Sequence, residues 1–107
     1  MEISNTNTLE LIKQQIATYP LILYMKGTPD KPCCGFSARS AQILKACGTK
    51  FAHVNILENT EIRHELPRYS NWPTFPQLYY KGELIGGCDI IEQLYKTGEL
   101  QKKISET

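Results

Sequence analysis

The chain has 107 residues, of which 41% are hydrophobic and 21% are charged, and this composition predicts one folded domain over residues 1–107 rather than a disordered chain. With 12 Lys and Arg against 11 Asp and Glu, the net charge is +1, which gives no reason to expect a nucleic-acid or membrane-surface partner. No apolar run approaches the roughly 18 residues of a membrane span. The polar N-terminus has neither a secretory signal nor an Arg-rich transit peptide, so we expect a cytoplasmic protein.

The cysteines provide the first chemical information. There are four of them: Cys33, Cys34, Cys47 and Cys88. Without a secretory signal, reduced thiols are expected rather than a disulfide framework. No C-x₂₋₄-C pair is present and the two histidines are not at zinc-finger spacing, which argues against a structural zinc site.

The first half of the chain predicts a helix, a strand and a second helix. Asn7 or Thr8 is the expected cap of the first helix, whose apolar residues share one face. Residues 21–25 form a continuous apolar run of strand length, which is typical of a strand buried on both faces. A loop rich in Gly and Pro follows at 26–32, and the second helix is expected over about 35–46.

The second half of the chain predicts a strand, a third helix, a hairpin and two further helices. Their expected bounds are 51–56 for the strand, about 60 onward for the third helix, 77–80 and 83–85 for the hairpin, about 89 onward for the fourth helix, and about 100–104 for the last one. Asn59 or Thr60 is the expected cap of the third helix. Two prolines predict an irregular segment over 69–76, and Gly86-Gly87 is expected to end the hairpin.

The order of these elements indicates the fold class. The strand–helix–strand half predicts two parallel strands joined by a right-handed crossover, and the hairpin adds an antiparallel pair. The expected fold is therefore α/β, with a four-stranded mixed β-sheet flanked by helices on both faces. A thioredoxin-like fold has this layout.

The chemistry centres on residues 32–37, Pro-Cys-Cys-Gly-Phe-Ser. Cys34 falls where the loop after the first strand meets the second helix, so unpaired backbone N–H groups and the helix dipole favour its thiolate. Lys26, Lys31 and Arg39 are close in sequence and add positive potential. We expect a nucleophilic or metal-binding thiolate at Cys34; the alternative is a small apolar side chain packed beside the helix start.

Ser37 stands where a C-x-x-C motif has its second thiol. A hydroxyl cannot attack a mixed disulfide formed at Cys34, so no intramolecular disulfide forms within this motif. A site with one cysteine must take its second thiol from another molecule.

Three segments of the chain resemble the monothiol (CGFS-type) glutaredoxins. They are Met25-Lys26-Gly27-Thr28-Pro29 with Pro32 and Cys34-Gly35-Phe36-Ser37, then Trp72-Pro73-Thr74-Phe75-Pro76, and finally Gly86-Gly87-Cys88-Asp89. These motifs have the order and spacing of that family. The resemblance covers nearly the whole chain as a single glutaredoxin domain.

The resemblance implies a glutathione site. Lys26 and Arg63 match the positions that hold the glycyl carboxylate as charge-assisted donors; for Arg63 the alternative is a solvated charge on a helix face. Phe75 precedes Pro76, and the bond between them is expected to be cis. The Phe75 backbone then pairs with the glutathione cysteine like an added strand; the alternative is a proline that merely ends the loop.

The other end of glutathione is expected at Cys88 and Asp89. Their backbone N–H groups, with the Asp89 side chain, fit the γ-glutamyl carboxylate and amine; the alternative for Asp89 is a plain helix cap. Trp72 is either a wall of the site or an ordinary aromatic residue. Phe36 either packs inward or faces a partner.

The remaining cysteines have secondary roles in this interpretation. Many relatives have another residue at Cys33, and adjacent cysteines tend to point apart, so we expect Cys34 as the metal ligand and Cys33 as a bystander. A disulfide between Cys34 and Cys88 after cluster loss is a further hypothesis. Cys47 is expected to be structural.

A [2Fe–2S] cluster needs four ligands, usually thiolates. Two Cys34 thiolates from two chains and two glutathione thiolates supply that number, so the resemblance implies a cluster that bridges a homodimer and serves iron–sulfur storage, transfer and biogenesis. Apo iron–sulfur proteins and BolA-like proteins are the implied partners, the latter also as targets of a regulatory adapter. The alternative is a weak glutathione-dependent thiol-disulfide oxidoreductase that removes glutathione from thiols through Cys34.

Overall fold

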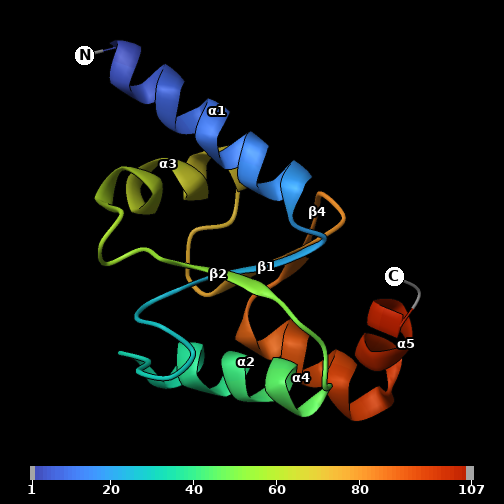
Figure 1. Cartoon of the computed structure of the whole chain (residues 1–107). Coiled ribbons are helices and arrows are strands. Elements are labelled where there is room, and N and C mark those ends of the chain that lie inside the picture. The colour runs from blue at the N-terminus through green and yellow to red at the C-terminus, as the bar shows by residue number, and fades with distance from the viewer. Residues whose placement is uncertain (1, 106–107) are drawn as a thin grey trace.

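The computed structural model describes residues 2–105, with the side chains of residues 7–105, and its helices and strands follow the predicted order (Figure 1). Their bounds are α1 Glu2–Thr18, β1 Leu21–Met25, α2 Gly35–Ala46, β2 Ala52–Asn55, α3 Thr60–Ser70, β3 Gln77–Tyr80, β4 Glu83–Gly86, α4 Cys88–Thr97 and α5 Glu99–Ser105. Of the helices in this part of the chain, none has the length and apolar character needed to cross a membrane.

The four strands form one mixed sheet in the order β2-β1-β3-β4. β1 pairs in parallel with β2 and antiparallel with β3, and β3 pairs antiparallel with β4. The β3–β4 hairpin turns at Lys81 and Gly82, whose φ angles are 49° and 84°. Two consecutive positive φ angles are typical of the tight turns that suit the twist of a hairpin. The predicted α/β class and four-stranded mixed sheet are confirmed.

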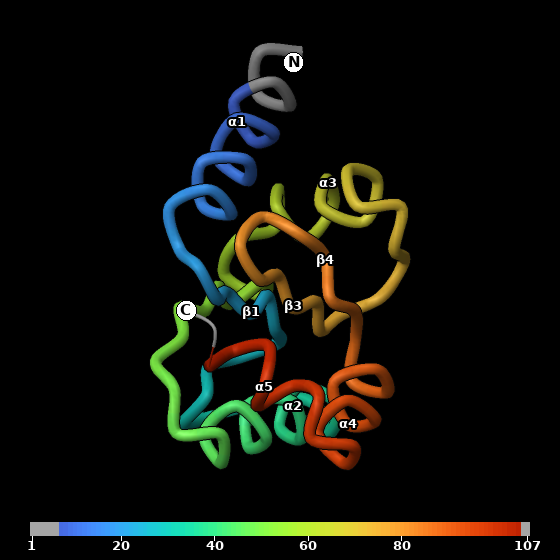
Figure 2. The backbone as a smooth tube through the Cα atoms, turned by 90° about the vertical axis from the view of Figure 1, so that its right-hand side faces the viewer, coloured from blue at the N-terminus to red at the C-terminus, as the bar shows by residue number. Residues whose placement is uncertain are grey.

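Helices cover both faces of this sheet, with α1 and α3 on one face and α2, α4 and α5 on the other (Figure 2). β1 is buried along its whole length. Its side chains alternate between the two cores: Leu21, Leu23 and Met25 pack against α2, α4 and α5, whereas Ile22 and Tyr24 pack against α1 and α3. A strand covered on both faces needs apolar residues at every position, which explains the uninterrupted run in the sequence.

The start of the first helix differs from the prediction. α1 begins at Glu2, well before the expected cap at Asn7 or Thr8. Thr8 lies inside the helix and is buried, and its hydroxyl donates a hydrogen bond to Glu61 Oε1 of α3 at 2.7 Å. This hydroxyl therefore joins two helices instead of capping one.

Two other boundaries are shifted. α3 continues through Pro67 to Ser70 and ends where Asn71 adopts a left-handed conformation with φ of 55°, so the predicted irregular segment begins later than position 69. β4 includes Gly86, and α4 begins at Cys88 directly after its N-cap Gly87. The chain thus passes from the last strand into α4 without a loop.

Candidate functional site

Cys34 is the N-cap residue of α2, at the junction where the sequence placed it. The loop that leads to it folds back on the end of β1, because the Cys33 N–H donates to the Lys26 carbonyl at 2.9 Å. Within this loop Gly27 has φ of 93°, and a Cβ at that position would lie 2.5 Å from the Lys31 carbonyl oxygen. Only glycine fits there, so the loop fixes where α2 begins.

The Cys34 sulfur is held by Ser37, one helical turn further on. The Ser37 N–H donates to Cys34 Sγ at 3.3 Å, and Ser37 Oγ lies 3.4 Å from the same sulfur. The Ser37 side chain is completely buried, and its oxygen accepts the Lys26 N–H at 3.0 Å. Since that oxygen is already an acceptor, its own hydrogen is free to donate to a thiolate at Cys34.

These contacts favour the ionised form of Cys34. Partial burial acts to raise the pKa of its thiol, but hydrogen bonds from the Ser37 hydroxyl and from the backbone N–H groups of Ser37 and Phe36, together with the charge of Lys26, outweigh it and hold the pKa below the ordinary thiol value. The predicted thiolate character therefore has a physical basis in the first turn of α2.

The neighbouring Cys33 points elsewhere. Its side chain is exposed and its thiol lies 3.8 Å from the Lys31 carbonyl oxygen, whereas the Cys34 sulfur faces Ser37. All four cysteines are free thiols. Divergent sulfurs cannot readily bind one iron together; the role of bystander for Cys33 stays a prediction.

A groove of about 570 Å³ lies beside this helix start. Five of the six residues predicted from the sequence line it, and they come from four different parts of the chain: Lys26, Arg63, Phe75, Cys88 and Asp89. Cys34 is not a lining residue, but its neighbours Lys26 and Phe36 are. Figure 1 shows four segments at the same end of the sheet: the end of β1, the start of α2, the α3–β3 connection and the start of α4.

The two cationic side chains of the groove are available to a ligand. Among the described residues, no ion pair joins Lys26 or Arg63 to an acidic side chain. Arg63 is an exposed residue of α3 but faces the groove, so it differs from a charge that only meets solvent. Together they form a positive wall suited to a carboxylate.

The groove also contains the start of α4. Gly87 is the N-cap residue and provides no side chain to bond the first N–H groups of the helix, which leaves them available for an anion. Asp89 lies in the first turn and is exposed, so it is not the helix cap. A Cβ on Gly87 would lie 3.2 Å from the Pro76 carbonyl oxygen and 3.4 Å from Trp72 Nε1, so glycine permits close approach of the groove wall.

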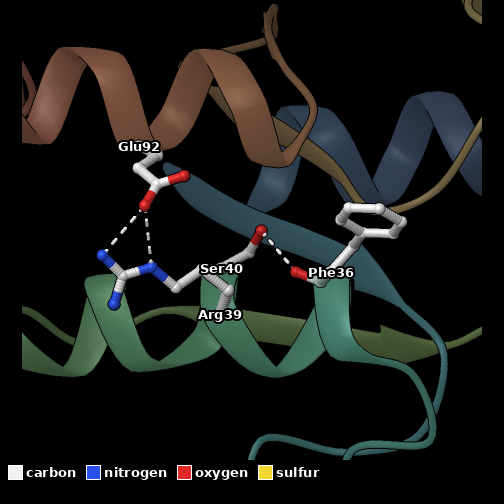
Figure 3. Close-up of polar contacts among 4 residues, drawn as sticks. All are labelled: Phe36, Arg39, Ser40 and Glu92. Carbon is white, nitrogen blue, oxygen red and sulfur yellow. Dashed lines mark hydrogen bonds and ion pairs between the residues drawn. The ribbon is translucent and has the colours of Figure 1, made fainter.

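The helices that carry these groups are tied together. Arg39 of α2 donates from Nε and Nη2 to Glu92 Oε2 of α4, at 3.1 and 3.0 Å (Figure 3). Both side chains are partly exposed, so this contact between the two helices adds at most about 1 kcal/mol. Figure 3 also shows the Phe36 ring projecting away from α2; it is 64% exposed and lines the groove, so it does not pack inward.

The α3–β3 connection forms the remaining wall. The Phe75–Pro76 bond is cis, as predicted, and Trp72, Pro73 and Thr74 line the groove beside Phe75. Trp72 therefore belongs to the wall of the site, which resolves the ambiguity left by the sequence.

Sequence analysis missed the residue that supports this wall. Gln77 is completely buried. The nitrogen of its side-chain amide donates hydrogen bonds to the carbonyls of Trp72 and Thr74. A signal was present, because Gln77 is the polar residue of an otherwise apolar strand, directly after Pro76.

The chain is similar to known proteins in both sequence and structure. A sequence model of the glutaredoxin family matches residues 21–85. Glutaredoxin 4 of Escherichia coli (strain K12) is 59% identical over 102 residues, covering 95% of this chain and 89% of that protein. Glutaredoxin 4 of Buchnera aphidicola subsp. Schizaphis graminum is 61% identical over 99 residues, covering 92% of each.

Solved structures agree in fold. The solution structure of reduced poplar apo GrxS14 superposes with a TM-score of 0.81 at 48% identity, covering 96% of this chain and 95% of that one. A buckwheat glutaredoxin–glutathione complex superposes with a TM-score of 0.86 at 21% identity, covering 99% of this chain and 94% of that one. The predicted thioredoxin-like fold is confirmed by these likenesses.

Proposed function

The chain belongs to the glutaredoxin family, in its monothiol branch, and on this basis we propose that it binds glutathione and carries a [2Fe–2S] cluster between two copies of itself. The cluster is cargo that the protein receives and hands on. In this proposal residues 1–107 act as one glutaredoxin domain.

The observation that carries the proposal is the groove beside Cys34. Glutathione is an extended peptide with a carboxylate at each end and an amine at one of them. Lys26 and Arg63 provide donors for the glycyl carboxylate, and the uncapped start of α4 with Asp89 provides partners for the γ-glutamyl carboxylate and amine. Phe75 also lines the groove, and in this proposal its backbone pairs with the cysteinyl unit as an added strand.

The cluster ligands follow from the number of thiolates at this site. Within the described part of the chain, no three His, Cys, Asp or Glu side chains come together as a metal site. Cys34 contributes one thiolate, a second copy of the chain contributes another, and two bound glutathiones supply the remaining two. Because two of the four ligands come from bound glutathione and not from the protein, release of the cluster is favoured, which suits a carrier.

Apo iron–sulfur proteins are the proposed recipients of the cluster, and BolA-like proteins are proposed partners of the loaded dimer. The exposed Phe36 beside Cys34 provides an apolar contact for such partners. We place this activity in the cytoplasm, where a reducing environment maintains free thiols such as the four in this chain.

A second candidate is supported by the lowered pKa of Cys34. A thiolate of this kind can attack the glutathione sulfur of a glutathionylated protein, which releases the protein thiol and leaves glutathione bound to Cys34. Free glutathione then attacks that mixed disulfide, releases oxidised glutathione and restores Cys34. Ser37 does not take part in this monothiol route as a nucleophile.

Anaerobic reconstitution distinguishes these functions. The protein is incubated with iron and sulfide, with or without glutathione, and visible absorption and oligomer size are recorded. The carrier predicts a chromophore and a dimer that both require glutathione; Cys34→Ser abolishes both and Cys33→Ser largely retains them. Rapid reduction of a glutathione mixed disulfide without any chromophore would instead support the oxidoreductase.

A further inference from the structure

The groove wall at residues 72–76 is supported from inside the protein by Gln77. This side chain lies at the start of β3, opposite Tyr24 of β1, and is completely buried. Tyr24 and Tyr79 belong to the core beneath α1 and α3. A buried amide there is unfavourable unless its donors and its acceptor are bonded.

All three hydrogen-bonding functions of the Gln77 amide are satisfied. Its Nε2 donates to the Trp72 carbonyl at 2.9 Å and to the Thr74 carbonyl at 3.2 Å. Its Oε1 accepts the hydroxyl of Tyr79 at 2.9 Å. The Tyr79 hydroxyl thus fixes which way the amide faces, and the amide holds two carbonyls of the groove wall.

The bond to Thr74 determines where the next N–H points. The Thr74 carbonyl and the Phe75 N–H belong to one trans peptide, in which C=O and N–H point in opposite directions. Because the carbonyl faces the buried Gln77, the Phe75 N–H faces away from it, and Phe75 lines the groove. Within residues 2–105 no hydrogen bond occupies this N–H.

We propose that Gln77, oriented by Tyr79, is a positioning residue that directs the Phe75 N–H toward the cysteinyl carbonyl of glutathione. The inference rests on the proposed glutathione site and deepens it. An apolar residue of the same size would fill the space but would not hold the Thr74 carbonyl. Glutamate would present acceptors to two carbonyls, so the position requires an amide.

Binding of S-methylglutathione tests the inference, because this probe reports the groove without thiol exchange or a cluster. Affinity is measured by NMR titration of ¹⁵N-labelled protein, together with the melting temperature. We expect Gln77→Met to weaken binding roughly tenfold, as loss of one well-made hydrogen bond does. We expect the Phe75 amide resonance to shift when the probe binds the unmodified protein, and to lose most of that shift in Gln77→Met.

Tyr79→Phe and Tyr24→Phe provide the matched comparison. Tyr79→Phe removes the hydroxyl that orients the amide and that also contacts Ser70. We expect weaker binding, and no further loss of affinity when it is combined with Gln77→Met. Tyr24→Phe removes a similar buried hydroxyl, which donates to Gln15 Oε1 at 2.7 Å, and leaves the groove wall untouched. It should lower stability without changing affinity.

The outcomes separate this inference from the function on which it rests. If the unmodified protein does not bind S-methylglutathione, the proposed glutathione site is wrong. If it binds, but Gln77→Met lowers the melting temperature with unchanged affinity and an unchanged Phe75 shift, Gln77 is merely structural and the inference is overturned.

Discussion

The buried hydroxyl of Ser37 is one of the groups that favour ionisation of Cys34. The Ser37 hydroxyl oxygen accepts a hydrogen bond from the Lys26 N–H, and its own hydrogen is available to donate to the Cys34 sulfur. The residue that replaces the second thiol of a C-x-x-C motif therefore has a positive role in the site: it cannot resolve a disulfide, but it stabilises the thiolate from which any such reaction or metal binding begins.

Removing this hydroxyl should make Cys34 a weaker acid. Ser37→Ala deletes a hydrogen bond to the thiolate, so the pKa of Cys34 should rise toward the ordinary thiol value. The rate of alkylation by iodoacetamide, plotted against pH, should then increase at a higher pH than in the unmodified protein. At neutral pH the rate should fall severalfold. The measurement is made with Cys33→Ser throughout, because Cys33 is exposed and would also react.

Ser40→Ala is the matched control for this change. Ser40 is equally buried in α2, but its hydroxyl donates to the Phe36 carbonyl at 3.0 Å and not to the sulfur. The dependence of the alkylation rate on pH in Ser40→Ala should coincide with that of the unmodified protein. Equal displacement by both variants would mean that helix distortion, and not the hydrogen bond, controls the thiol.

At the scale of elements, α3 presents cations to two different surroundings. Arg63 faces the groove, whereas Arg68 on the same helix does not line it. Arg68 Nη1 instead lies 4.0 Å from Glu65 Oε2. We expect Arg63→Gln to weaken binding of S-methylglutathione by about tenfold at low salt, because a charge-assisted hydrogen bond is lost. The loss should shrink as salt screens the exposed charge.

Arg68→Gln tests whether position on the helix matters. It removes the same charge from α3 and should leave the affinity unchanged, as measured by the same titration. Similar weakening by both variants would indicate a diffuse electrostatic effect and would return Arg63 to the status of a solvated helix charge.

How well each element could be predicted depends on whether its signal is local. The apolar run of β1 indicates a strand because each face of the sheet meets a core. The start of α1 could not be fixed, since several residues that favour helix caps lie near Thr8, and Thr8 itself is used in a contact with distant Glu61. Asn71, by contrast, was a usable signal for the end of α3, because Asn tolerates the left-handed conformation found there.

The candidate site divides in the same way. Short motifs predicted Cys34, Phe75, Cys88 and Asp89 as site residues, because these residues lie in loops and at helix starts that the local sequence describes. Gln77 was missed because its polarity within an apolar strand marks the position but not the role, which depends on how the two carbonyls of the preceding loop fold onto its amide.

At the scale of the whole molecule, the starts of α2 and α4 are brought to the same groove. The Arg39–Glu92 pair joins these helices, one beginning after Cys34 and the other beginning at Cys88. Each helix start favours a negative charge, so the fold gathers the positive ends of two dipoles where thiolates and carboxylates are proposed to bind.

This arrangement also underlies the predicted disulfide between Cys34 and Cys88 in protein without a cluster. With oxidised glutathione, the Cys34 thiolate forms a mixed disulfide and releases one glutathione. The Cys88 thiolate then attacks the Cys34 sulfur, forms the intramolecular bond and releases the second glutathione. Cys88 is buried at 9% exposure, so its thiol must become accessible for this step, with the two Cα atoms within about 7 Å of each other.

Mass spectrometry under non-reducing conditions tests this step. We expect a peptide linking Cys34 to Cys88, retained in Cys33→Ser; Cys88→Ser should stop at the glutathione adduct of Cys34. The intramolecular bond would remove the thiolate that is proposed to bind the cluster, so the oxidised protein should fail to take up a cluster until it is reduced. A disulfide that involves Cys33, or a glutathione adduct of Cys34 that persists although Cys88 is present, would contradict this prediction. Either result would show that the Cys88 thiol does not reach Cys34, and that cluster loading responds to glutathione alone.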